Sequence, residues 1–277
     1  MVGITVGAVL NIILDPILIF SAGLGVAGAG WATIISQFVS FCLLFLGCNR
    51  GSNIRIRFKN VRFWLYYFHM IFRGGLPSLA RQCLASLATI CLNHAARPHG
   101  DAIIAAMGVV QRISMFGAST MLGFGQGFQP VCGFNYGAGL YDRVKKGFWF
   151  CVKVSTAALI LIGAAGYTFA PQLIALFRDD PAVIACGAAA LRFQCITFPV
   201  QGWIVMSNMM EQSMGRTVPA TFLATARQGL FLIPVIWILF ACFGLLGIQM
   251  AQAVADVLTL ACAIPIHLYV MRTLERK

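Results

Sequence analysis

The sequence predicts an all-α polytopic membrane protein with about eight transmembrane helices. Hydrophobic residues make up 60% of the 277 residues, and charged residues make up only 10%. Ordinary soluble domains hold about 45–50% apolar and about 25% charged residues. The mean hydropathy of +0.85 is correspondingly high. This composition excludes a soluble enzyme, a disordered chain and a nucleic-acid-binding domain. We therefore expect no enzymatic activity, no nucleic-acid partner and a lipid bilayer as the surroundings.

Eight apolar runs define the expected spans, because a helix that crosses a bilayer needs about 20 mostly apolar residues. Helices are favoured because backbone groups in lipid must be bonded within their own segment. Strands of a membrane barrel would alternate apolar and polar residues, and these runs do not. The runs cover residues 3–20, 26–48, 76–96, 103–132, 148–170, 183–210, 218–243 and 245–270.

Basic residues between the spans predict the orientation of the chain, whose net charge is +12. One side of the expected bilayer has only Arg97 and Arg178. By the positive-inside rule, the other and more basic side faces the cytoplasm. We therefore expect a multi-pass protein of the cytoplasmic (inner) membrane with both termini in the cytoplasm. The basic side carries Arg50, Arg55, Arg57, Lys59, Arg62, Arg73, Arg143, Lys145, Lys146, Arg216, Arg272, Arg276 and Lys277.

Residues 55–73 read RIRFKNVRFWLYYFHMIFR and combine basic with aromatic side chains. RNA binding is one interpretation of such a segment, but an amphipathic connector lying on an anionic leaflet fits it better. Trp64, Tyr66 and Tyr67 suit the headgroup zone of a membrane. This connector divides the chain into three expected parts: two spans in residues 1–50, the connector in 51–75 and six spans in 76–277.

Two acidic segments indicate where helices begin. Asp101 follows Gly100 and is expected to cap the N-terminus of the fourth span. Asp179 and Asp180 precede Pro181, a pattern that is typical of a helix start.

The last two spans repeat features of the first two. A short loop leads into a helix in both places, with GVAG at 25–28 and GLLG at 244–247. In that register Ala32 aligns with Ala251. Transporters are often built from internal repeats. If the last six spans form one repeat, the first two spans are the end of another. About four further spans are then expected ahead of Met1.

Four segments carry a resemblance to a known family. They are GAVLNIILDPILIFSAGLGVAGAGWATIISQ, RGGLPSLARQ, GDAIIAAMGVVQRISMFGASTMLGFGQGFQPVCGFNYGAGLYDRV and SMGRTVPATFLATARQGLFLIPV. Through them the chain resembles the multidrug and toxic-compound extrusion (MATE) family. In order, they resemble its fifth-to-sixth helix segment, the start of its seventh helix, its eighth helix with the following loop, and its tenth-to-eleventh connection. The third segment is the most specific.

The resemblance implies a twelve-helix fold of two six-helix lobes related by pseudo-twofold symmetry. This chain resembles helices five to twelve, which are a complete six-helix C-lobe and the last two helices of an N-lobe. Met1 then falls inside a helix of the family pattern. We therefore expect an N-terminally truncated sequence, for which a missing N-terminal half is a candidate partner.

The resemblance also implies a cation-coupled antiporter, driven by H⁺ or Na⁺, that exports drugs or toxic organic compounds across the cytoplasmic membrane. The substrates are expected to be small, organic and cationic, and no cofactor, catalytic residue or metal site is expected. Two alternatives stay open. One is a non-transporting fragment that needs a partner chain, and the other is a lipid-linked sugar flippase of the wider superfamily. The eighth-helix segment favours a drug exporter over a flippase.

Polar residues inside the spans are candidates for an ion or substrate pathway, because such residues are costly in lipid. Asn11 and Asp15 are four residues apart and share a helix face. Arg81 lies near the cytoplasmic end of its span, where snorkelling to the headgroups is an equal alternative. The candidates are Asn11, Asp15, Arg81, Gln82, Gln111, Arg112, Gln126, Gln129 and Asp256.

Asp256 is the strongest acidic candidate in the last six spans because it lies in the middle of its span. Arg227 in the preceding span is a candidate partner. Members of the resembling family often carry a glutamate in the seventh helix, and none occurs here between residues 77 and 96. Glu211 lies at the cytoplasmic end of its span near Arg216, and we expect it to form a surface ion pair.

Overall fold

The computed structural model describes residues 2–50 and 65–275, and its elements in these ranges are all helices. Eight of them are long and apolar enough to cross a membrane, which confirms the predicted fold class. The chain is therefore a multi-pass membrane protein. The spans are Gly3–Ser21, Gly25–Cys48, Gly74–His99, Asp101–Gly137, Tyr141–Thr168, Pro181–Ser213, Thr217–Phe243 and Leu245–Thr273.

The chain forms two units, Met1–Tyr67 and Phe68–Lys277, which are described separately. Most of the expected connector, including its basic residues at 55–62, lies outside the described residues. Its last part belongs to a helix that begins at Leu65.

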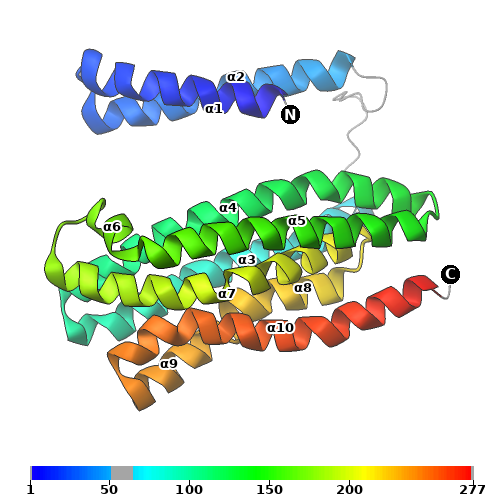
Figure 1. Cartoon of the computed structure of the whole chain (residues 1–277). Helices are drawn as coiled ribbons and strands as arrows, with labels where there is room; N and C mark the ends of the chain where they lie inside the picture. Colours follow the sequence, from blue (N-terminus) through cyan, green and yellow to red (C-terminus); the bar gives the residue numbers. More distant parts are fainter. Residues whose placement is uncertain (1, 51–64, 276–277) are drawn as a thin grey trace. The chain divides into compact units, whose positions relative to one another are not determined.

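The first unit is a helical hairpin of α1 (Val2–Pro16), the π-helical turn η1 (Ile17–Ser21) and α2 (Gly25–Arg50) (Figure 1). The Ser40 hydroxyl on α2 donates to the Gly3 carbonyl on α1 at 2.9 Å. A Cβ placed on Gly7 would lie 2.7 Å from the Cβ of Ser40. Small residues thus let the two helices approach closely, as is common in membranes.

The second unit holds the other six spans, which run alongside one another in Figure 1. One of them is broken into three pieces, because α8 and α9 are joined by a single π-helical turn. The elements are α3 (Leu65–Ala96), η3 (Arg97–His99), α4 (Asp101–Gly137), α5 (Tyr141–Thr168), α6 (Ala170–Ala175), α7 (Pro181–Ser213), α8 (Thr217–Thr225), η4 (Ala226–Leu230), α9 (Leu232–Phe243) and α10 (Leu245–Glu275).

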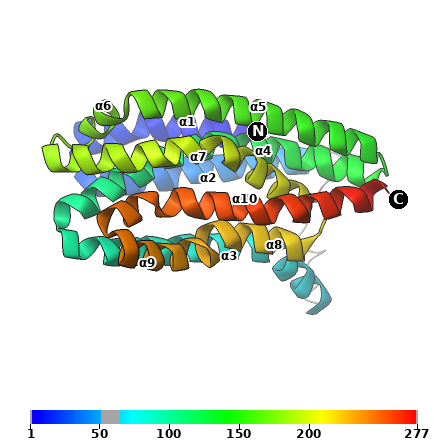
Figure 2. The same ribbon diagram turned by 60° about the horizontal axis from the view of Figure 1, so that its bottom comes forward.

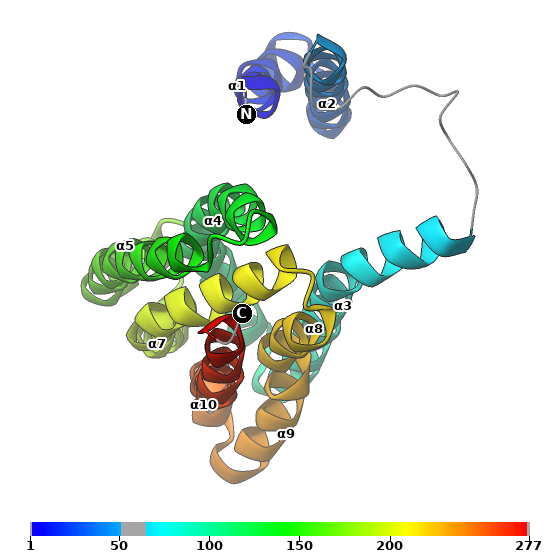
Figure 3. The same ribbon diagram turned by 90° about the vertical axis from the view of Figure 1, so that its right-hand side faces the viewer.

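Helix α7 is the centre of the second unit. It packs against α4 and α5 on one side and α10 on the other, and Figure 3 shows it between them. Its side chains are buried along most of its length, unlike those of helices that face lipid. Polar side chains on α7 are therefore held inside the bundle. The largest fully buried side chains include Phe148, Leu191, Met206, Met210, Ile236 and Ile248.

Of the two acidic segments that were expected at helix starts, one caps its helix and the other does not. Asp180 caps α7 as predicted, since its carboxylate accepts from the Ala182 amide at 2.9 Å. The predicted cap at Asp101 is wrong, because Gly100 takes the N-cap position with φ +94°. Asp101 is instead the first helical residue of α4, where its charge lies near the positive end of the helix dipole.

The two turns that lead into α2 and α10 share two features, as their similar sequences suggest. Gly25 has φ +54° and Gly244 has φ +58°, values that favour glycine. Three residues later, a Cβ on Gly28 would collide with the carbonyl of Leu18, and a Cβ on Gly247 with that of Leu239. Each hairpin thus depends on a glycine that packs against the backbone of the preceding helix.

We predict that Gly247→Ala lowers the free energy of unfolding by about 1–3 kcal/mol, because a backbone carbonyl cannot rotate away from the added methyl group. Unfolding of the purified protein in detergent measures this. The matched control is Gly108→Ala on α4, where nothing lies within 4 Å of the new Cβ. Equal stability of the two variants would contradict the proposed close contact.

Candidate functional site

The main polar cluster of the second unit surrounds Asp256, which is completely buried in the middle of α10. Arg227 Nε donates to Asp256 Oδ1 at 2.9 Å, so the structure brings the two sequence-predicted partners together. The Arg227 side chain is only 16% exposed. Because a buried ion loses its hydration, each of these charges depends on the other for neutralisation.

Three neutral side chains complete the surroundings of the Asp256 carboxylate. Gln201 Nε2 donates to Oδ2 at 2.8 Å, and Thr197 Oγ1 donates to the same oxygen at 3.4 Å. Gln252 Nε2 donates to Oδ1 at 3.1 Å. Hydrogen bonds to a charged acceptor are stronger than those between neutral groups. One carboxylate thus connects η4, α7 and α10.

Arg227 reaches Asp256 from the π-helical turn η4. Such turns interrupt the regular spacing of an α-helix and occur often at functional sites. Gly229 in the same turn packs closely against α3, since a Cβ there would lie 2.6 Å from Leu84 Cδ2. This contact holds η4 against α3 while Arg227 extends toward α10.

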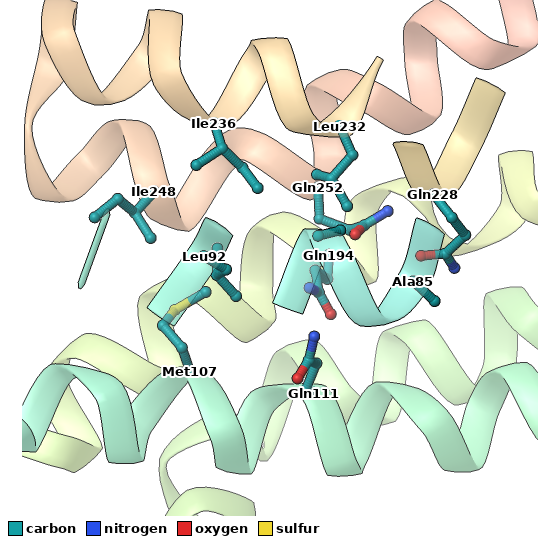
Figure 4. A pocket seen from close by; sticks show the side chains of 11 residues that line it. Ala85, Leu92, Met107, Gln111, Gln194, Gln228, Leu232, Ile236, Ile248 and Gln252 are labelled. Carbon is teal, nitrogen blue, oxygen red and sulfur yellow. The ribbon is translucent and has the colours of Figure 1, made fainter. Parts of the chain in front are cut away.

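A pocket lies next to this cluster, between α3, α4, α7, η4, α9 and α10 (Figure 4). Four glutamines from four different elements line it: Gln111, Gln194, Gln228 and Gln252. In Figure 4, Gln111 and Gln194 point toward one another. The rest of the lining is apolar, with Ala85, Ala88, Leu92, Met107, Leu232, Ile236 and Ile248.

Gln252 belongs to both the pocket and the Asp256 cluster, so the pocket extends to within one side chain of the buried carboxylate. The space open to the centres of water molecules is about 40 Å³. One water needs roughly 10–15 Å³ on this measure. The pocket can therefore hold a few waters with amide partners.

Gln129, another predicted candidate, belongs to a separate polar chain. Its Nε2 donates to Gln212 Oε1 at 3.1 Å, and Gln212 Nε2 donates to the Ser78 hydroxyl at 3.2 Å. This chain joins α4, α7 and α3.

The remaining predicted candidates are described unit by unit. Asn11 and Asp15 are half-buried on α1 in the first unit, and the Asn11 side-chain nitrogen has no hydrogen-bond partner among the described residues. In the second unit Arg81 is half-buried, and Gln82, Arg112 and Gln126 are exposed. None of these four second-unit side chains is hydrogen-bonded to Asp256 in the described part of the chain.

Sequence reasoning missed five polar residues of the cluster and the pocket: Gln194, Thr197, Gln201, Gln228 and Gln252. The spacing of polar residues in the sequence could have identified several of them. Gln194, Thr197 and Gln201 recur at spacings of three and four, which puts them on one face of an otherwise apolar helix. Gln252 precedes Asp256 by one helical turn.

The expectation of a surface ion pair at Glu211 is wrong. Glu211 is completely buried, and neither of its carboxylate oxygens has a partner among the described residues. The physical reason is that α7 continues to Ser213 and α8 packs back against it, so this position lies inside the bundle.

The MatE family model matches residues 77–238, which is more than half of the chain. The multidrug export protein MepA of Staphylococcus saprophyticus is 28% identical over 278 residues. MepA of Staphylococcus aureus is 27% identical over 273 residues. Each alignment covers 98% of this chain and 60% of the relative, so the chain spans about 60% of the length of these curated relatives.

Solved structures share the fold. A crystal structure of MATE in the straight conformation has 23% identity and a TM-score of 0.90, covering 100% of this chain and 63% of that one. The outward-facing conformation of a multidrug resistance MATE family transporter of the MOP superfamily has 24% identity and a TM-score of 0.89, with the same coverage. The arrangement of helices is therefore that of these transporters.

We predict that Asp256→Asn and Arg227→Gln each lower the free energy of unfolding by about 3–5 kcal/mol, because each leaves one buried charge without its partner. The double variant recovers much of this loss, since neither charge remains. Unfolding of the purified variants in detergent measures the effect, with Asp142→Asn at an exposed position as the control. Purely additive losses would contradict the pairing.

Proposed function

Because this chain belongs to the MatE family of membrane transporters, we propose that it exports small organic cations from the cytoplasm in exchange for protons. Members of the family are transporters and not enzymes. The substrate class is supported by two relatives, at 28% and 27% identity, that are named multidrug export proteins. The observation that carries the coupling mechanism is the buried Asp256–Arg227 pair beside an amide-lined pocket.

The pocket suits water or protons rather than the exported compound. Pockets for drug-sized ligands occupy about 300–1,000 Å³, far more than the space of about 40 Å³ found here. Its glutamines offer both donors and acceptors to water. We assign it the role of a hydrated path to Asp256.

The positive charge of Arg227 favours a proton over Na⁺ as the coupling ion. A metal ion at the Asp256 carboxylate would lie close to the guanidinium and be repelled by it. A proton instead binds covalently to a carboxylate oxygen and neutralises the group. Arg227 then loses its counter-charge, and the contact between η4 and α10 weakens.

This loss of attraction links proton binding to movement. In the deprotonated form, the Asp256 carboxylate holds η4, α7 and α10 together through charge-assisted hydrogen bonds. In the protonated form these bonds are weaker, and the helices can shift against one another. Transporters of related design alternate access by moving such bundles around a central site.

The distribution of charge supports a location in the cytoplasmic membrane with the basic end of the second unit in the cytoplasm. The α4–α5 turn, the α7–α8 turn and the C-terminal end of α10 lie toward one end of this unit (Figure 2). That end carries Arg143, Lys145, Lys146, Arg216 and Arg272.

We predict that Asp256→Asn abolishes proton-driven efflux, because an amide cannot exchange a proton with water. Cells that produce the protein are loaded with a fluorescent organic cation, and its loss is followed while the external pH is varied. Asp142→Asn at an exposed site is the control. Unchanged efflux with an unchanged pH dependence, at equal protein level, would reduce Asp256 to a structural role.

We also predict that Ala88→Leu slows efflux by filling the pocket and excluding its water. Ala88 is 3% exposed and lines the pocket. The matched control is Ala165→Leu on α5, where the side chain is exposed. If both variants transport at the wild-type rate, protons reach Asp256 by another route.

A further inference from the structure

Glu211 is a second acidic group inside the membrane, and its surroundings differ from those of Asp256. It is completely buried two residues before the end of α7, and neither carboxylate oxygen has a hydrogen-bond partner in the described residues. Ser207, one turn earlier on the same face, also has a buried hydroxyl without a partner. Asp256, in contrast, is bonded by Arg227, Gln201, Thr197 and Gln252.

No described cation compensates a charge on Glu211. The helices that pack against α7 include α4, α5, α8 and α10, and α3 reaches this end through the Gln212–Ser78 hydrogen bond. Arg216 is near enough for its charge to act on Glu211, yet neither an ion pair nor a hydrogen bond joins the two side chains. The titratable and charged groups of these elements toward this end are Arg81, Cys83, Cys132, Tyr136, Tyr141, Asp142, Arg143, Lys145, Lys146, Cys151, Arg216, His267, Tyr269 and Arg272.

An ionised carboxylate in such a place is strongly disfavoured, because it has lost its hydration and gained no partner. The neutral acid avoids this penalty. We propose that Glu211 is a proton-binding site, separate from Asp256, that is occupied in this conformation of the protein.

The same geometry indicates what happens when the proton leaves. The corner between α7 and α8 is closed by neutral contacts: the Arg216 amide donates to the Glu211 carbonyl at 3.0 Å, and the Asn208 side chain donates to the Ala220 carbonyl. A charged Glu211 needs either water or the Arg216 guanidinium. Because Glu211 is completely buried, either partner reaches its carboxylate only if the packing at the corner loosens, so deprotonation favours the open corner.

Opening this corner moves α8, which continues directly into η4 and Arg227. The two acidic groups are then linked through one helix. This link rests on the transport mechanism proposed above, whereas the proton site itself does not.

Infrared spectroscopy tests the site directly, because only a protonated carboxyl group shows the C=O stretch of a carboxylic acid. The chain has just two glutamates, Glu211 and Glu275. Labelling the glutamate carboxyl carbon with ¹³C therefore shifts the band of these two residues and leaves those of all aspartates, including Asp256, in place. The protein is purified whole and placed in lipid nanodiscs.

We expect a ¹³C-shifted carboxylic-acid band at neutral pH that is absent in Glu211→Gln and retained in Glu275→Gln. Because the label identifies glutamate in the wild-type protein, the test remains decisive even if a variant folds poorly. Absence of the shifted band in the wild type, or its persistence in Glu211→Gln, overturns the proposal.

Hydrogen–deuterium exchange of residues 208–220 tests the opening of the corner in the same samples. After correction for the base-catalysed intrinsic rate, exchange should become faster as rising pH removes the band, and this additional pH dependence should be absent in Glu211→Gln. Exchange that does not change as the band disappears overturns the opening. Neither measurement depends on transport. The infrared and exchange results therefore test Glu211, and the efflux assay separately tests the proposed function.

Discussion

The second unit is organised by one constraint: a charge held away from water must be neutralised where it lies. The Asp256 carboxylate meets this constraint with Arg227, and the consequences extend over three elements. The π-helical turn η4 presents the guanidinium, α7 supplies Thr197 and Gln201, and α10 supplies Gln252 beside the carboxylate itself. The central position of α7 follows from the same requirement, since its polar face must be covered on all sides.

We propose that Glu211 meets the constraint in the other way, by binding a proton. The two acids lie on helices that pack against each other. Asp256 accepts hydrogen bonds from three neutral side chains and from Arg227, whereas neither Glu211 carboxylate oxygen has a partner among the described residues. In the proposed mechanism, proton binding at Asp256 removes an attraction, and proton release from Glu211 creates an unpartnered charge. Both proposed changes act on the span formed by α8, η4 and α9.

Hydropathy predicted the eight spans because the bilayer imposes a length and a composition on each helix, and both can be read along the chain. Asp256 and Arg227 were also identifiable, since charged residues in apolar runs are rare. The pocket was not predicted, because glutamine at Gln194, Gln228 and Gln252 is unremarkable in each helix and becomes a cluster only when several helices meet. Glu211 was misjudged because its nearness to Arg216 in the sequence suggested a surface pair, whereas its carboxylate lies inside the bundle.

In the proposed mechanism, proton binding at Asp256 breaks its contact with Arg227. Structures of the protein in lipid nanodiscs, determined by electron cryomicroscopy at alkaline and at acidic pH, test this most directly. The account predicts that Arg227 Nε and Asp256 Oδ1 stay within hydrogen-bond distance at alkaline pH, as in the 2.9 Å contact found here, and separate at acidic pH with a shift of η4 against α10. An intact pair under acidic conditions in which the protein still exchanges protons for substrate would contradict it.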